Sequence, residues 1–169
     1  MDQLCIAFIP LVRVQFDVPL AEQMIQAARE NLVSAGFKLV GPQQPVSDLS
    51  AAQAAINELS TVGVDLTLVF QASFADSTMV TALAEGIDAP LFLWGIPEPW
   101  TGGRLRLNSL CGINLAGHAL TLRGRKFDYA YAQPQSEAVI AQVRALAAAG
   151  WLRRRLKAAR VGVVGEHPN

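Results

Sequence analysis

Short apolar runs that alternate with longer segments of helical period constrain this chain more than any other feature. The runs cover residues 4–9, 37–40, 66–70, 90–94 and 127–131, and a segment with apolar residues at every third or fourth position follows each of them. Strands and helices in strict alternation are typical of successive βαβ units with right-handed crossovers. The sequence therefore predicts an α/β domain, in which helices cover a twisted parallel sheet of five strands.

Composition agrees with a sheet that is covered on both faces. Apolar residues make up 51% of the 169 residues and the mean hydropathy is +0.28, as expected for strands that are apolar throughout. A chain of this length buries roughly 68–70% of its unfolded surface without a disulfide or a metal. Cys5 and Cys111 lack a CxxC partner, so both are predicted to be reduced packing residues.

Charge and hydropathy argue against two classes of partner. Fourteen basic residues balance fourteen acidic ones, so the chain lacks the positive field that non-specific nucleic-acid binding needs. The basic cluster at 153–160 is expected to be a solvated helix face near a helix C-terminus. The apolar runs are shorter than the roughly 20 residues that span a bilayer. We therefore expect neither nucleic acid nor membrane as a partner, and a cytoplasmic protein.

Local signals set the ends of the predicted elements. Pro10 is expected to close the first strand, and the helix that follows is predicted over 19–35. The last helix, rich in alanine, is predicted over 136–160, and Gly150 is its one poor helix former. The predicted N-caps of the three middle helices are Ser47 or Asp48, Asp76 or Ser77, and Asn108 or Ser109.

The last residues, VGVVGEHPN, look like a sixth strand with nothing after it to cover it. One interpretation is that residues 1–160 form one domain, and that 161–169 begin a second α/β domain of a longer protein from which this chain was cut. The other is that this strand pairs at the edge of the sheet and completes the domain. Because parallel sheets are normally covered on both faces, we favour the first.

Candidate binding residues follow the strands, because ligands of an open parallel sheet bind beyond the carboxyl ends of its strands. The loop after the fourth strand, from Gly95 to about Leu107, is long enough to suggest function or mobility. Aromatic and polar side chains there could hold a polyol, although any loop edge collects such residues. The residues of this expected rim are Arg13, Gln71, Ser73, Phe74, Asp76, Trp94, Glu98, Trp100, Arg104 and Arg106.

Motifs of other α/β proteins are missing. The turn after the first strand lacks the glycines and hydroxyls that cradle a phosphate, and Asp17 stands alone where a phosphoacceptor domain needs several acids for magnesium. GxGxxG, GxxxxGK[ST] and HExxH do not occur. His118 is expected to be a packed or helix-face histidine rather than a base. The sequence therefore predicts no complete active site and no catalytic residue in this chain.

One stretch carries a family resemblance. Residues 91–131, LFLWGIPEPWTGGRLRLNSLCGINLAGHALTLRGRKFDYAY, resemble the N-terminal domain of the L-fucose and L-arabinose isomerase family, and NSLCG with the alanine-rich helix after it is the most specific part. The rest has a similar layout: a strand ending in proline and arginine, a third strand leading into SFADST, and a long basic helix before VGVVGEHPN. The resemblance thus covers essentially the whole chain.

The resemblance implies a flavodoxin-like three-layer αβα sandwich whose five-stranded parallel sheet has the order 2-1-3-4-5. It also implies that the chain is part of an aldose–ketose isomerase that uses manganese or a similar divalent ion. The metal ligands and catalytic carboxylates of the family lie in later domains, so they are expected beyond Asn169, and the piece alone is expected to be inactive.

In that family the N-terminal domain helps to build a homo-oligomer, a trimer or hexamer, and closes over the sugar bound by a neighbouring subunit. The resemblance assigns sugar contacts to Arg13, Phe74 and Trp94. Because Ser73-Phe74 stands where fucose isomerases have tryptophan, a sugar other than L-fucose is favoured. Two alternatives remain open: a free-standing module that binds a sugar or small metabolite without catalysis, and a domain that serves oligomerisation alone.

Overall fold

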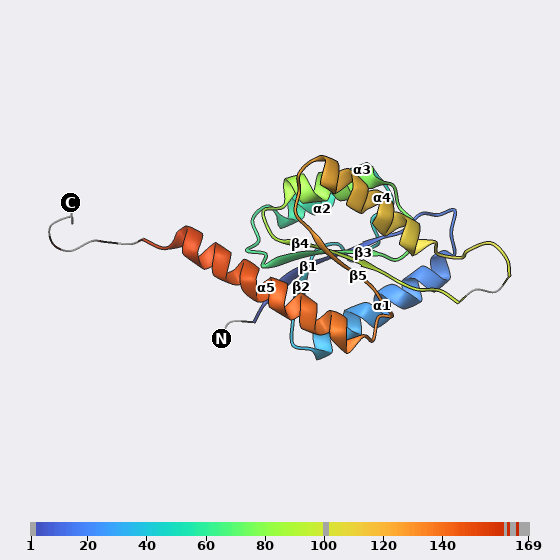
Figure 1. Ribbon diagram of the computed structural model, residues 1–169, viewed down its shortest axis with the longest axis horizontal. Helices are drawn as coiled ribbons and strands as arrows, with labels where there is room; N and C mark the ends of the chain where they lie inside the picture. Colours follow the sequence, from blue (N-terminus) through green and yellow to red (C-terminus); the bar gives the residue numbers. More distant parts are fainter. Residues whose placement is uncertain (1–2, 100–101, 161, 163–164, 166–169) are drawn as a thin grey trace.

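A three-layer arrangement of helices around one sheet makes up the protein, seen in a computed structural model that describes residues 3–99, 102–160, 162 and 165 (Figure 1). Five parallel strands pair in the order β2-β1-β3-β4-β5, so the predicted α/β fold and strand order are confirmed. The strands are β1 (Cys5–Leu11), β2 (Lys38–Val40), β3 (Leu66–Gln71), β4 (Leu91–Gly95) and β5 (Asp128–Tyr131). The helices are α1 (Val18–Ser34), α2 (Leu49–Leu59), α3 (Ser77–Gly86), α4 (Ser109–Leu122) and α5 (Glu137–Ala158).

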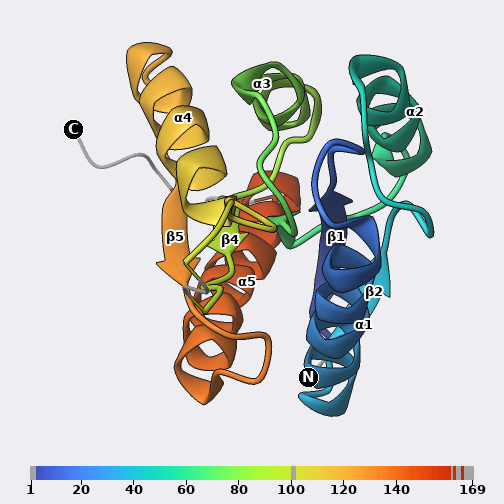
Figure 2. The ribbon, with the colours of Figure 1, turned by 90° about the vertical axis from the view of Figure 1, so that its right-hand side faces the viewer.

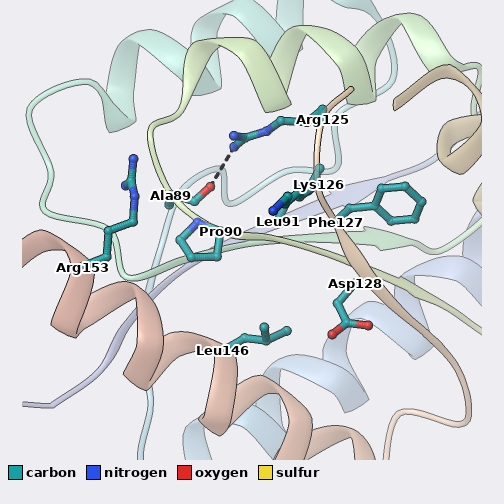
Figure 3. Close-up of a pocket in the computed structure, with 9 residues that line it drawn as sticks. All are labelled: Ala89, Pro90, Leu91, Arg125, Lys126, Phe127, Asp128, Leu146 and Arg153. Carbon is teal, nitrogen blue, oxygen red and sulfur yellow. Dashed lines mark hydrogen bonds between the residues drawn. The ribbon is translucent and has the colours of Figure 1, made fainter. Parts of the chain in front are cut away.

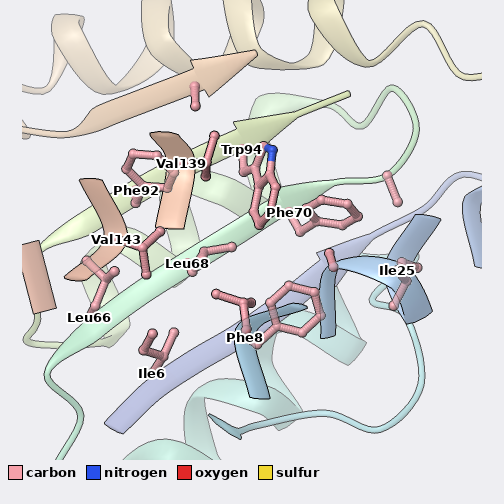
Figure 4. Packing of buried hydrophobic residues seen from close by; sticks show 14 of the residues in the cluster. Ile6, Phe8, Ile25, Leu66, Leu68, Phe70, Phe92, Trp94, Val139 and Val143 are labelled. Carbon is pink, nitrogen blue, oxygen red and sulfur yellow. The ribbon is translucent and has the colours of Figure 1, made fainter. Parts of the chain in front are cut away.

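The helices divide between the two faces of the sheet, with α2, α3 and α4 on one and α1 and α5 on the other (Figure 2). Each face has its own apolar core, because side chains alternate between the faces along every strand. Ile6 and Phe8 point toward α1 and α5, whereas Ala7 and Ile9 point toward α2 and α3. Figure 4 shows the first of these cores.

Side chains cap four of the five helices. The Asp48 carboxylate accepts a hydrogen bond from the backbone N–H of Ala51, and Asp76 accepts one from Thr78, so the aspartate of each predicted pair is the N-cap. Helix α4 also begins where predicted, but Asn108 at its N-cap has a left-handed backbone (φ 54°) and makes no side-chain cap. A different part of the chain fastens this helix, as described below.

Pro10 does not end the first strand, contrary to the prediction, since β1 continues to Leu11. In a strand, the N–H and C=O of one residue point to the same side, and the carbonyl of Pro10 accepts from the N–H of Val46. That side lies beyond the end of β2, which pairs only with residues 5–7 of β1. The N–H that proline lacks is therefore not needed by the ladder.

Helix α5 packs on the sheet from its first turns as far as Gly150, and its C-terminal end then projects past the sheet (Figure 1). Gly150 makes the close approach possible, because a Cβ at this position would lie 1.8 Å from the carbonyl oxygen of Asp65. The Asp65 side chain is buried, accepts from the backbone N–H of Cys5 (2.8 Å) and pairs with Arg154 of α5 (2.7 Å).

The basic cluster on α5 is more than the solvated face that the sequence predicted. Lys157 and Arg153 both pair with the Asp88 carboxylate, at 2.8 and 2.6 Å, and these hydrogen bonds, that of Lys157 first, lower the pKa of Asp88 to about 2. With the Arg154–Asp65 pair, they tie the end of α5 to the loops before β3 and β4. Part of the cluster therefore has a structural role.

The two cysteines differ in their surroundings. Both are unpaired, but Cys5 is buried in β1 whereas Cys111 is exposed on α4, so the packing role predicted for Cys111 is wrong.

His118 is exposed on the surface of α4, one of the two placements expected for it. None of the helices in the described ranges is both long and apolar enough to cross a membrane. Apart from residues 162 and 165, the strand predicted at 161–169 lies outside the described residues.

Candidate functional site

Arg13 connects the carboxyl ends of β1 and β3. It follows β1, and its backbone N–H donates to the Ser73 hydroxyl after β3 at 2.9 Å. Its guanidinium pairs with the Asp76 carboxylate at 2.9 Å and lies 5.8 Å from the centre of the Phe74 ring. Arg13 and Phe74, two of the three predicted sugar contacts, are thus brought together at the edge where ligands of parallel sheets bind.

Phe16 extends this contact, and sequence reasoning missed it. Its ring packs against Phe74 with the centroids 6.0 Å apart, and the guanidinium of Arg104 lies 5.8 Å from the Phe16 ring centre. We call the four residues Arg13, Phe16, Phe74 and Arg104 the arginine–phenylalanine rim. The available signal was a phenylalanine in the loop directly after a predicted strand, since such loops form the carboxyl edge of the sheet.

A single carboxylate shapes the long loop that carries Arg104. Glu98 accepts hydrogen bonds from three consecutive backbone N–H groups, those of Arg106 (2.7 Å), Leu107 (2.9 Å) and Asn108 (2.6 Å). These N–H groups belong to the two residues before α4 and to its N-cap, so Glu98 fastens the chain just ahead of the helix and does not cap its first turn. The predicted functional loop is therefore fastened at its C-terminal end.

Two further contacts fix this end of the loop against the sheet. Arg106 pairs with Asp17, the N-cap of α1, at 2.7 Å, and the N–H of Phe74 donates to the carbonyl of Leu107 at 2.7 Å. The pKa of Asp17 is lowered, mainly by the hydrogen bond from the N–H of Leu20 and then by Arg106. The loop, α1 and the β3–α3 connection are thus held as one frame around the rim.

Gln71 lies below the surface, although the sequence placed it on the rim. Its side chain is fully buried against Gly112 of α4, where an added Cβ would lie 2.7 Å from the amide oxygen of Gln71. Within the described part of the chain, neither amide atom has a hydrogen-bond partner. The Ser109 hydroxyl donates to the Gln71 carbonyl and accepts from the N–H of Ile96 at 2.9 Å. These contacts hold the first turn of α4 on the end of β3.

Trp94, the third predicted sugar contact, is not part of the rim. It is fully buried on the face that α5 covers, and its ring meets Phe70 edge-on with the centroids 5.2 Å apart (Figure 4). Its indole N–H donates to the carbonyl of Ala132 at 3.0 Å. In this chain it has no exposed surface for a sugar, so we keep only Arg13 and Phe74 from the predicted set. Trp100 lies outside the described residues.

A hollow of about 350 Å³ lies at the opposite edge of the sheet, between the starts of β4 and β5 and helix α5 (Figure 3). Its basic groups are partly engaged: Arg125 donates to the carbonyl of Ala89 at 2.8 Å, and Arg153 pairs with Asp88. Because ligands of parallel sheets bind at the carboxyl edge, we place the candidate site at the rim instead.

The rim can recognise a ligand but is poorly equipped to transform it. It offers guanidinium groups and phenylalanine rings, which bind anions and the apolar faces of sugars. Within residues 3–99, 102–160, 162 and 165, no three His, Cys, Asp or Glu side chains are grouped to hold a metal ion. The described residues therefore do not fit a manganese site.

Comparison with known proteins gives one consistent result. A family described as "Fucose/sulfoquinovose isomerase, N-terminal domain" matches residues 7–154. Proteins named sulfoquinovose isomerase from Priestia aryabhattai and Alkalicoccus urumqiensis are 29% and 27% identical to the chain, over 99% and 98% of its length. A protein of the same name from Clostridium sp. (strain MSTE9) is 28% identical over 99% of the chain. The chain spans 37–38% of the length of these relatives.

Proposed function

Because the chain belongs to the fucose/sulfoquinovose isomerase N-terminal domain family, we propose that it is the substrate-covering and assembly domain of an aldose–ketose isomerase. The observation that carries this proposal is the arginine–phenylalanine rim at the carboxyl edge of the sheet. The two unpaired cysteines fit a protein that acts in the reducing cytoplasm.

The described residues indicate which steps this domain would perform and which it would leave to the rest of the polypeptide. Isomerisation moves a proton between adjacent carbons of an open-chain sugar, and a divalent ion such as manganese would supply polarisation of the sugar oxygens. The described part of this chain has no ligand cluster for such an ion. Its contribution is therefore to bind the sugar at Arg13 and Phe74 and to exclude water from a reaction centre formed by other residues.

The proposed substrate is sulfoquinovose or a closely similar sulfonated sugar. The relatives reported above carry that substrate in their names. Ser73-Phe74, where tryptophan is typical of fucose isomerases, also favours a sugar other than L-fucose. In sulfoquinovose a sulfonate on C6 replaces the hydroxyl group of glucose, so a rim rich in arginine suits it.

Replacing Phe74 with alanine in the complete polypeptide that carries this domain should raise the KM for sulfoquinovose roughly 10-fold. Phe74 is half-buried and contacts both Arg13 and Phe16, so the change removes the centre of the apolar surface. Steady-state kinetics with a coupled ketose assay measure the effect. Leu49→Ala, at an exposed position of α2, is the control and should leave KM unchanged.

An unchanged KM in the Phe74→Ala variant would contradict the covering role. Calorimetry on the 169-residue chain distinguishes the main alternative. A domain that provides only part of a site should bind free sugar too weakly to detect, whereas tight binding would favour an independent sugar-binding module.

Helix α4 supports the assembly part of the proposal. Its sequence, SLCGINLAGHALTL, contains no Asp, Glu, Lys or Arg although one side of the helix faces solvent. Leu115, Leu122 and the neighbouring Tyr129 of β5 are 38%, 73% and 58% exposed. Large apolar side chains on an uncharged, solvent-facing side of a helix are typical of a surface that another protein covers. Two copies of an uncharged face meet without like-charge repulsion, so we propose a second copy of this chain as the partner.

The double substitution Leu115→Glu and Leu122→Glu should lower the oligomeric state of the protein, because it places charges in the proposed interface. Light scattering coupled to size-exclusion chromatography measures the mass. The matched control is Leu152→Glu with Leu156→Glu on α5, where both side chains are also exposed. Unchanged mass in the α4 variant, or equal dissociation in the control, would contradict this interface.

A further inference from the structure

The arginines around the rim differ in what neutralises them. Arg13 pairs with Asp76 and Arg106 pairs with Asp17, so both are balanced by a carboxylate and hold the frame together. Arg104 is exposed and has no carboxylate partner within the described residues; its one recorded contact is with the Phe16 ring. Of these three, Arg104 is therefore the one whose charge remains available to a ligand.

The acidic groups nearby do not oppose an anion at Arg104. Both oxygens of Glu98 are engaged by the N–H groups at the start of α4. The carboxylates of Asp17 and Asp76 each accept from an arginine and from a helix N-terminus. Each of these carboxylates is thus already paired with groups of the frame, whereas the guanidinium of Arg104 lies over the Phe16 ring.

Phe16 positions Arg104 without occupying its donors. A contact between a guanidinium and a ring uses no oxygen acceptor. The N–H groups of Arg104 that can donate two parallel hydrogen bonds to one oxyanion therefore stay free. The Phe16–Phe74 pair continues from that point to Arg13. A ligand with an apolar face and an anionic end would match this sequence of groups.

We propose that Arg104 is the residue that binds the C6 sulfonate of the sugar and so sets the preference for a sulfonated substrate. This assignment rests on the proposed function, in which the rim covers the substrate. A sulfonate is a permanent anion whose oxygens can accept paired hydrogen bonds from a guanidinium. The carbon face of the sugar then lies against Phe16 and Phe74, and Arg13 stays paired with Asp76.

The test compares two sugars that differ only in the sulfonate, sulfoquinovose and quinovose (6-deoxyglucose), in the complete polypeptide. Arg104→Gln should lower kcat/KM for sulfoquinovose about 10- to 100-fold, the range of a hydrogen bond to a charged group, mainly through KM. The same variant should change kcat/KM for quinovose less than two-fold. Arg104→Lys, which keeps the charge but loses the fork, should fall between wild type and Arg104→Gln.

The matched control is Arg144→Gln, which also removes an arginine stacked on a phenylalanine (Phe37, 4.7 Å) but lies on α5 away from the rim. It should leave both sugars unaffected. An equal loss for both sugars in Arg104→Gln, or no loss for sulfoquinovose, would overturn the assignment while leaving the isomerase function standing. A wild-type enzyme that prefers glucose 6-phosphate would overturn sulfonate as the anion. A wild-type enzyme inactive on sulfoquinovose would refute the proposed function itself.

Discussion

Gly150→Ala should destabilise the protein by about 3 kcal/mol, although alanine is the better helix former by about 1 kcal/mol. The new Cβ would lie 1.8 Å from the carbonyl oxygen of Asp65 and 2.9 Å from its carbonyl carbon. Both are backbone atoms of the residue just before β3, so they cannot rotate away as the end of a side chain could. Helix α5 must lift from the sheet, which also strains the Arg154–Asp65 pair.

Chemical denaturation followed by circular dichroism measures this change in the free energy of unfolding. Gly117→Ala in α4 is the matched control, because its Cβ would meet only the edge of the half-buried Phe127 ring, at 3.1 Å. That variant should stay within about 1 kcal/mol of wild type. A Gly150→Ala protein as stable as wild type would show that α5 does not rest on the β3 backbone as described.

Trp94→Ala should cost about 3–5 kcal/mol, the range for emptying a large aromatic site in a core. The indole is fully buried between the sheet and α5, packs on Phe70, and donates to the Ala132 carbonyl. The substitution leaves a cavity and a buried carbonyl without its donor. Urea unfolding followed by circular dichroism measures the loss.

Trp94→Phe separates this structural role from sugar binding. Phenylalanine refills most of the volume but still deprives the Ala132 carbonyl of its donor, so we expect a loss of about 1–2 kcal/mol. The KM for the sugar in the complete polypeptide should not change. A strong rise in KM for Trp94→Phe would return Trp94 to the binding site and contradict the placement seen here.

Local signals were enough to predict most of the fold. Apolar periodicity separates strands from helices over a few residues, and Asp48 and Asp76 cap their helices by reaching their own first turns. The prediction that Pro10 ends the first strand was wrong because a proline breaks a strand only where a neighbouring strand needs its N–H. At Pro10 the neighbouring strand β2 has already ended, and the local sequence does not reveal this. Gly150 could be recognised as a weak point of its helix, but its contact with residue 65 is long-range.

The site was predicted less completely, because it depends on which way side chains point at the end of a strand. Both Gln71 and Trp94 stand at or next to the carboxyl ends of their strands, yet helices α4 and α5 extend far enough to bury them. Arg13 and Phe74 come after their strands and reach the surface. Phe16 was overlooked because only the folded chain brings it against Phe74. Their roles in sugar binding remain predictions.

The three hydrogen bonds to Glu98 anchor the C-terminal end of the loop but not the residues between Glu98 and Arg106, which include Arg104. The start of α4 and Arg106 are fixed by the carboxylate, whatever length of chain connects residues 98 and 106. Insertions, deletions or substitutions between these two points can therefore move or remove Arg104 without disturbing the hydrophobic interior. Such a construction lets substrate preference diverge quickly within a family while the scaffold beneath it is retained.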